Sequence, residues 1–395
     1  MVYKELPERE ISQVFRRRNI PSGNQQMSIF FIIKIKEREA NMMHLRGCRI
    51  QIILVAAIFL LAWGAAWGNE SLRYADLGDF RLENGSTIRE CRLAYRIHGK
   101  LNSQKSNTIL IPTWLAGTTQ DLVDLGIVGP GKVIDSSRYY VIAVDSFGNG
   151  VSSSPSNSAV QPDRAFPQFS IRDMVRAQHV LLTRHLNMHR IHAVIGLSMG
   201  GMQAFQWMVL YPDFMDKVIP IAGSPWMTSN DLLLWAAELG IIENVQSCKG
   251  GDSAMKTLAP MHTLLLWTPR FRVAATKPAS VPEFLSGLEK SFLKYNPTDW
   301  AWQVKAIMTQ DILKEFDGSP EKAAKAVHAK TLVISTTQDQ IIYPEPAKTF
   351  ARLLKTETAE LTGDCGHLAF LCESDRLRTL VDGFLKRCTR IPGKE

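Results

Sequence analysis

Three residues of this chain have the types and the order that nucleophilic acyl chemistry needs: Ser198, Asp339 and His367. A serine hydroxyl is a weak nucleophile, so it needs a neighbouring base to take its proton, and a histidine can fill that role. The histidine in turn needs a carboxylate that holds it in one tautomer and stabilises its cation. The sequence therefore predicts a catalytic triad in which Ser198 attacks, His367 transfers the proton and Asp339 orients the imidazole.

The serine lies within Gly196-Leu197-Ser198-Met199-Gly200, a G-x-S-x-G pattern. The residues before it, 190–195, are mostly apolar and β-branched, which is typical of a buried parallel strand. The residues after it, 200–211, carry apolar side chains at helical spacing. A strand, a sharp turn and a helix in this order form a nucleophile elbow. Both glycines are expected because a side chain there would clash with the flanking strand and helix. A glycine-rich turn that carries a serine by chance is the less favoured interpretation.

Two aspartates compete for the role of the acid. Asp364 is nearer to His367 in the sequence, but it lies in the same loop and would struggle to reach the far ring nitrogen. Asp339 comes just after a predicted strand, 331–336, and ligands bind at the carboxyl ends of parallel strands. We therefore predict Asp339. Among the histidines that remain beyond residue 68, surface or packing roles suffice, and His262 is the one worth testing.

The charge that develops on a carbonyl oxygen during attack needs two backbone N–H donors. One is expected at Met199, directly after the nucleophile. The other is expected in the loop after the predicted strand 108–114, where Leu115 and Ala116 are both candidates. No cofactor is implied, because the sequence shows no G-x-G-x-x-G, no phosphate-binding lysine loop and no metal-ligand cluster.

Strand and helix patterns alternate along most of the chain, which predicts the α/β class, a mostly parallel sheet with helices on both faces. Residues 74–98 are predicted to form a hairpin that turns at Asn84-Gly85. A helix over 170–187 is predicted to begin at Ser170, with Asp173 completing a near capping box. The other predicted strands are 108–114, 139–144, 190–195, 217–222, 331–336 and 358–361, and the other helices are 200–211, 346–354 and 374–388.

This alternation breaks between residues 225 and 326, where helical patches occur without clear strands. We predict a mainly helical cap there, inserted between the two parts of the core, 69–224 and 327–395. The tryptophans of this cap could line a hydrophobic acyl pocket, although burial in the cap's own core is the favoured interpretation. They are Trp226, Trp235, Trp267, Trp300 and Trp302.

Residues 1–68 differ from the rest of the chain. They hold 10 of the 46 Lys and Arg residues and 5 of the 38 Asp and Glu residues, so most of the formal charge of +8 lies there. The remainder is close to neutral, which is no signature of nucleic-acid binding.

Within this N-terminal extension, two arginines precede an apolar run over 50–62, and small residues follow up to position 68. That order is typical of a secretory signal peptide. The alternative is an uncleaved membrane anchor, because 50–67 is nearly long enough to span a bilayer. We therefore expect export to the periplasm or the medium, or a membrane tether with the catalytic domain outside the cytoplasm.

The six cysteines do not form a disulfide framework or a zinc motif. Cys48 lies in the targeting segment, and the others are sparse and odd in number. One bridge near the C-terminus is compatible with an exported protein, and buried or free thiols are the simpler interpretation. The remaining five are Cys91, Cys248, Cys365, Cys372 and Cys388.

Several stretches together resemble the homoserine O-acetyltransferases and their relatives in the α/β-hydrolase superfamily. The resemblance covers about 75–225 and 330–388, and its first block is far more specific than G-x-S-x-G alone. The matching stretches are Val128-Gly129-Pro130-Gly131-Lys132, Ile134-Asp135, Phe166-Pro167, Ser170 to Gln178, Ser198 to Ala204 with Gln206-Trp207, Gly366-His367 and Ala369-Phe370-Leu371.

The resemblance implies an α/β-hydrolase fold and a ping-pong acyl transfer through Ser198, and it implies Leu115 as the second oxyanion donor. One departure concerns the acceptor. Members that use homoserine resemble each other in a Gly-His-Asp sequence, whose aspartate helps to hold the amino group, whereas Leu368 follows His367 here. The family's arginine for the substrate carboxylate has no anchored match; Arg270 and Arg272 are the candidates.

We therefore predict a serine acyl-transfer enzyme that acts on a small-molecule ester or acyl donor, with water as the acceptor. The alternative is a genuine homoserine O-acetyltransferase or another acyl-CoA-dependent O-acyltransferase. A third hypothesis, from a different class, is a non-catalytic binding protein on the same fold.

Overall fold

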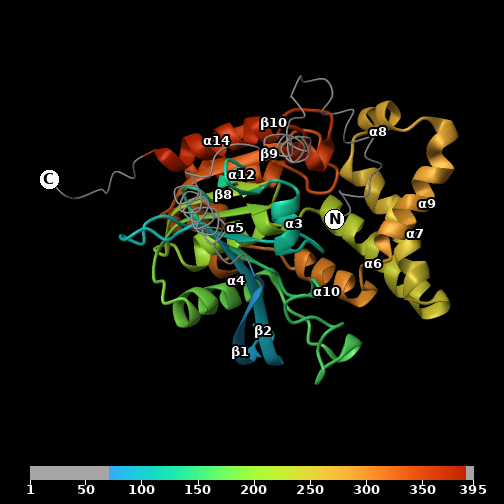
Figure 1. Ribbon diagram of the computed structural model, residues 1–395, viewed down its shortest axis with the longest axis horizontal. Helices are drawn as coiled ribbons and strands as arrows, with labels where there is room; N and C mark the ends of the chain where they lie inside the picture. The colour runs from blue at the N-terminus through green and yellow to red at the C-terminus, as the bar shows by residue number, and fades with distance from the viewer. Residues whose placement is uncertain (1–70, 388–395) are drawn as a thin grey trace, which may run out of the picture.

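An eight-stranded sheet organises the part of the chain that the computed structural model describes, residues 71–387 (Figure 1). The strand order is β1-β2-β6-β3-β7-β8-β9-β10. The pairs β1–β2 and β2–β6 are antiparallel, and all later neighbours are parallel. The predicted α/β fold is confirmed. The strands are β1 (Arg73–Arg81), β2 (Thr87–His98), β3 (Thr108–Pro112), β6 (Tyr140–Val144), β7 (Ile191–Leu197), β8 (Met215–Ile221), β9 (Lys330–Thr336) and β10 (Glu357–Leu361), and a separate small sheet pairs β4 (Val128–Gly129) with β5 (Ile134–Asp135).

Helices follow most of the parallel strands, as a sheet of this class requires. The longer helices outside the cap are α4 (Ile171–Val180), α5 (Met199–Leu210), α12 (Glu345–Leu354) and α14 (Ser374–Lys386), and the short ones are α3 (Thr119–Asp124) and α13 (Ala369–Cys372). Helix α5 packs on β7 and β8, and α4 packs on α5. The predicted nucleophile Ser198, which lies between β7 and α5, is therefore positioned by the middle of the sheet.

The start of α4 follows the prediction and its end does not. Ser170 Oγ accepts a hydrogen bond from the backbone N–H of Asp173, and the Asp173 carboxylate accepts one from the Ser170 N–H, which completes the capping box. The predicted helix over 170–187 stops being α-helical at Val180 and continues as a π-helical segment, Leu181–His185. Apolar spacing does not distinguish these two windings.

Between β8 and β9 the chain forms helices, of which α6 to α9 lie to the right of the sheet in Figure 1. Trp235, Trp267 and Trp300 are buried among them, whereas Trp226 and Trp302 are half-buried. His262 is buried too, and its Nδ1 lies 2.7 Å from Oε1 of Glu238. These contacts give His262 a packing role inside the cap. The helices are α6 (Ser229–Lys249), α7 (Gly251–Leu266), α8 (Pro269–Ala275), α9 (Val281–Phe292), α10 (Pro297–Met308) and α11 (Pro320–Ala326), and short 3-10 turns occur at Asp163–Ala165, Pro278–Ser280, Lys314–Phe316 and Gly366–Leu368.

The predicted signal peptide or membrane anchor lies outside the described residues, as do Cys48 and Cys388. Within residues 71–387, no helix has the length and apolar character needed to cross a membrane.

Candidate active site

The nucleophile elbow is built by close backbone contacts. Ser198 lies between β7 and α5 with φ 56° and ψ −122°, a strained conformation for a residue with a side chain. A Cβ atom on Gly196 would lie 1.9 Å from the carbonyl oxygen of Gly200, and one on Gly200 would lie 2.7 Å from the carbonyl oxygen of Pro112. No rotamer change relieves a clash with backbone, so glycine is required at both positions. The clash at Gly196 with the flanking helix is the one expected from the sequence, whereas the clash at Gly200 is with the neighbouring strand β3.

The structure brings the three predicted residues together in one hydrogen-bonded line. Nε2 of His367 lies 2.8 Å from Oγ of Ser198, and Nδ1 lies 2.7 Å from Oδ2 of Asp339. The side chains of His367 and Asp339 are 4% and 2% exposed, so the base and the acid are shielded from bulk water, whereas Ser198 is half-buried. Such an arrangement can move the serine proton to the imidazole while the carboxylate stabilises the imidazolium.

Asp339 is held rigidly at the end of β9. Its Oδ1 accepts hydrogen bonds from the backbone N–H groups of Ile341 and Ile342, both at 2.9 Å, and its Oδ2 accepts one from the Thr336 hydroxyl at 2.8 Å. The competing Asp364 has a side chain that is 41% exposed and pairs with Arg270 at 3.2 Å. Geometry therefore favours Asp339 as the partner of the imidazole. The same pair occupies Arg270, one of the two arginines considered for a substrate carboxylate.

A disulfide brackets the loop that carries His367. Cys365 and Cys372 are bonded, and the histidine lies between them in a single 3-10 turn. The cap packs directly on this loop: a Cβ on Gly366 would lie 2.9 Å from the carbonyl oxygen of Leu266 at the end of α7. The sequence allowed one bridge near the C-terminus without identifying its two cysteines. Among the described residues, Cys91 is a buried thiol and Cys248 an exposed one.

The loop after β3 distinguishes the two candidate oxyanion donors. The N–H of Ala116 donates to Oε1 of Gln303 at 2.7 Å, so it is already used. The N–H of Leu115 has no hydrogen-bond partner among residues 71–387. Met199 is the first residue of α5, where backbone N–H groups lack partners within the helix. Leu115 and Met199 are therefore the two residues of the predicted oxyanion hole whose N–H groups remain available, and Met199 directly follows Ser198.

A buried carboxylate supports this loop from the end of the neighbouring strand β6. Asp145 accepts hydrogen bonds from the backbone N–H and the hydroxyl of Thr119 and from the Asn149 amide, at 2.8–2.9 Å. Burial raises the pKa of Asp145 to about 6, and these hydrogen bonds oppose the rise. We did not predict this role, because nothing in the sequence indicates that Asp145 faces the loop after β3.

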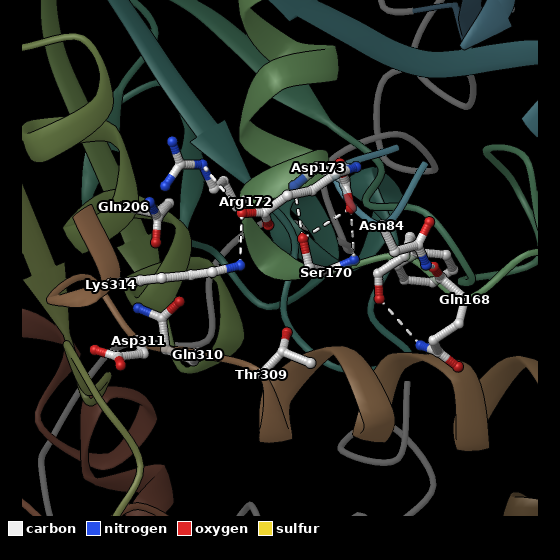
Figure 2. A pocket seen from close by; sticks show the side chains of 12 residues that line it. Asn84, Gln168, Ser170, Arg172, Asp173, Gln206, Thr309, Gln310, Asp311 and Lys314 are labelled. Atoms are coloured by element: carbon white, nitrogen blue, oxygen red, sulfur yellow. Dashed lines mark hydrogen bonds and ion pairs between the residues drawn. The ribbon is translucent and has the colours of Figure 1, made fainter. Parts of the chain in front are cut away.

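A hollow of about 210 Å³ has none of the predicted site residues in its lining. Figure 2 shows the side chains that line it. It lies between the start of α4, the β1–β2 turn and the residues that follow α10. Its cations are paired, since Glu83 accepts from Lys314 at 2.9 Å and lies 3.8 Å from Arg172. Within the described part of the chain, no three His, Cys, Asp or Glu side chains gather as a metal site would need.

A family model described as alpha/beta hydrolase fold matches residues 131–373. The chain belongs to this α/β-hydrolase family. It is 30% identical over 337 residues to the ethyl acetate hydrolase of Pseudomonas veronii, covering 80% of this chain and 95% of that protein. It is also 30% identical over 355 residues to the homoserine O-acetyltransferase of Methanococcoides burtonii, covering 78% and 72%.

The chain is also similar to a solved structure. The acetylester hydrolase from Corynebacterium glutamicum superimposes with a TM-score of 0.73 at 26% identity and covers 79% of this chain and 96% of its own. The resemblance to the homoserine O-acetyltransferase-like branch of the α/β-hydrolase superfamily is thus confirmed. Esterases and acetyltransferases both occur among these relatives, so the chain is an α/β-hydrolase enzyme of the hydrolase or acyltransferase type.

Proposed function

We propose that this chain is an exported serine esterase that hydrolyses small esters through an acyl-Ser198 intermediate. The observation that carries the proposal is the hydrogen-bonded line from Ser198 Oγ through His367 to Asp339. The backbone N–H groups of Leu115 and Met199 have no partner within residues 71–387 and are the expected oxyanion donors. A nucleophile, a base, an orienting acid and two oxyanion donors are the parts that acyl transfer needs.

The reaction divides into two proton-balanced halves. Ser198 Oγ attacks the ester carbonyl carbon while its proton passes to Nε2 of His367, and the resulting oxyanion accepts hydrogen bonds from Leu115 and Met199. The tetrahedral intermediate expels the alcohol, which takes the proton from His367 as it leaves. A water molecule then attacks the acyl group with His367 as base, and the carboxylic acid departs as the proton returns to Ser198.

Two features favour water over a homoserine acceptor. The residue after His367 is Leu368, which is fully buried, so the place of the transferases' aspartate is apolar. The Cys365–Cys372 bond supports export, because disulfides persist in oxidising compartments, outside the cytosolic supply of acyl-CoA. The name of the Pseudomonas veronii relative makes short acyl esters the first substrates to test.

The second candidate is an acyl-CoA-dependent O-acyltransferase, including a homoserine O-acetyltransferase. Extensive similarity to proteins of that name favours it. The same nucleophile would then pass its acyl group to an alcohol in place of water.

The deciding experiment supplies the purified protein with ethyl acetate, and separately with acetyl-CoA and homoserine. Ester hydrolysis that Ser198→Ala abolishes, without release of CoA, is expected. Release of CoA that depends on homoserine would establish the transferase. Failure of both reactions, with no acyl-enzyme in the mass spectrum, would indicate a binding protein.

A matched pair of variants tests the acid. Asp339→Asn is expected to lower kcat by roughly 10⁴-fold, as loss of the orienting carboxylate does in serine proteases. Asp364→Asn, in the same neighbourhood but paired with Arg270, is expected to leave kcat within about twofold.

Export is tested by sequencing the N-terminus of the natural protein, which should begin near residue 69. A retained Met1 would contradict a cleaved signal.

A further inference from the structure

We propose that Gln303, on cap helix α10, is a positioning residue that sets the oxyanion hole. The proposal rests on the acyl chemistry proposed above. Gln303 is fully buried and its amide bridges two turns of the core. Its Oε1 accepts a hydrogen bond from the Ala116 N–H at 2.7 Å, and its Nε2 donates to the Phe147 carbonyl oxygen at 2.8 Å. One side chain of the cap thus joins the turn after β3 to the turn after β6.

The first of these bonds acts on the peptide next to the oxyanion donor. Ala116 has φ 55°, a left-handed conformation that residues with side chains rarely adopt. An N–H held in that orientation by Gln303 cannot compete with the neighbouring N–H of Leu115 for the oxyanion. Gln303 therefore fixes which of two consecutive amides faces the reacting carbonyl.

The second bond places the side chain itself. The turn after β6 is shaped around it, since a Cβ on Gly148 would lie 3.0 Å from Cγ of Gln303 and 2.7 Å from the ring of Phe169. With Nε2 tied to Phe147 and the stem enclosed, Oε1 has one direction to point. A displacement of α10 would therefore be transmitted to Ala116 and Leu115.

Gln310 provides a matched control in the same region. It is also a buried glutamine that joins the residues after α10 to the core, and its Nε2 donates to the carbonyl oxygens of Met202 and Ser224, both at 3.2 Å. It contacts the core without reaching the loop after β3. A variant of Gln310 should therefore lose stability through weaker cap anchoring, but its oxyanion hole should keep its geometry and its kcat should not change.

The test compares Gln303→Leu with Gln310→Leu in the full chain, using an acetyl ester and methyl trifluoromethyl ketone, whose hydrated or serine-bound form mimics the tetrahedral intermediate. Gln303→Leu should lower kcat by between about tenfold and about a hundredfold, less than removal of a donor itself, with KM changed by less than about twofold. Affinity for the ketone should fall by the same factor as kcat. Gln310→Leu should lower Tm while kcat stays within about twofold.

A conservative variant, Gln303→Glu, gives a second readout. Its carboxyl keeps an acceptor for the Ala116 N–H, but in the charged form it faces the Phe147 carbonyl oxygen without a proton to donate. Protonation restores that donor. The ratio of variant to wild-type kcat should therefore rise as the pH is lowered, which a merely structural role would not produce.

Unchanged kcat and ketone affinity in Gln303→Leu, or equal losses in Gln310→Leu, would overturn the proposal. If Gln303→Leu does not fold, a flat kcat ratio for Gln303→Glu across pH would overturn it. If the wild-type protein hydrolyses no ester, the proposed function fails separately. Ketone affinity then still tests Gln303, because it requires Ser198 and the oxyanion donors but no turnover.

Discussion

The nucleophile elbow and the cap both shape the candidate active site, but by opposite means. At the elbow, Gly196 lies against the backbone of Gly200, and Gly200 lies against the backbone of Pro112 in β3, so the close contacts are with backbone atoms. The cap reaches the site through single side chains, such as Gln303, whose partner Ala116 is 187 residues away in the chain. At the elbow, the backbone contacts therefore require glycine at both positions. In the cap, most residue types can change as long as a few side chains, such as Gln303, keep their contacts.

The largest expected effect comes from adding one methyl group to each region. Gly196→Ala should cost about 4 kcal/mol or more of unfolding free energy, or prevent folding, because its Cβ would meet the Gly200 carbonyl oxygen. Gly287→Ala, in cap helix α9, should stabilise by about 0.5–1 kcal/mol, because nothing lies within 4 Å of that Cβ and alanine favours a helix. Denaturant unfolding checks both. Equal effects would remove the distinction between the two regions.

The loop that carries His367 contacts both regions, Ser198 at the elbow and Leu266 in the cap. Removal of its disulfide is expected to have the next largest effect. Cys365→Ser with Cys372→Ser should cost about 2 kcal/mol of stability, since the bond closes a short loop. It should also lower kcat several-fold, because His367 would spend less time within hydrogen-bond distance of Ser198.

Thermal unfolding and steady-state kinetics under oxidising conditions measure the two losses. Cys248→Ser is the control, since it removes an exposed thiol that is not part of the bond. A double variant with full kcat would show that cap packing on Gly366 alone positions the histidine.

The smallest expected effect is a change of stability with pH, and it comes from a buried carboxyl group between the cap and the core. Asp299 in α10 accepts hydrogen bonds from the backbone N–H and hydroxyl of Ser156, and burial raises its pKa to about 6. A raised carboxyl pKa means that its stabilising contribution is present below about pH 4 and is lost as the pH rises through 6.

The amide in the Asp299→Asn variant would not titrate, so the Tm of this variant relative to wild type should increase between pH 4 and pH 6 and then level off. The corresponding change in the free energy of unfolding, relative to wild type, should be on the order of 1 kcal/mol. Calorimetry across this range measures it, and a constant Tm difference would show that the carboxyl is not perturbed.

The same contrast explains what could be predicted from the sequence. The elbow, the capping box of α4 and the choice of Asp339 over Asp364 follow from local spacing and from the place of strand ends, and the geometry agrees. The residues alone left Leu115 and Ala116 open as the second oxyanion donor, because the hydrogen bond that occupies the Ala116 N–H comes from the distant Gln303. A lone glutamine in a cap helix carries no local signal of its distant partner.

The π-helical end of α4 was not predicted, because apolar spacing does not distinguish a π-helical from an α-helical winding. The short helix α3 was not predicted either, although its capping box, formed by Thr118 and Asp121, is a local signal that could have indicated it. The pairing of Cys365 with Cys372 could not be chosen without knowledge of the turn around His367.

A buried lysine links a strand inside the sheet to the end of the C-terminal helix. Lys217 of β8 is 1% exposed, and its Nζ donates to the carbonyl oxygens of Leu385 at 2.6 Å and Arg387 at 2.8 Å, at the end of α14. A lysine is costly to bury unless its ammonium group is hydrogen-bonded. The end of α14 supplies such acceptors to strand β8, so a change that loosens this helix end should weaken a strand inside the sheet as well as the helix itself.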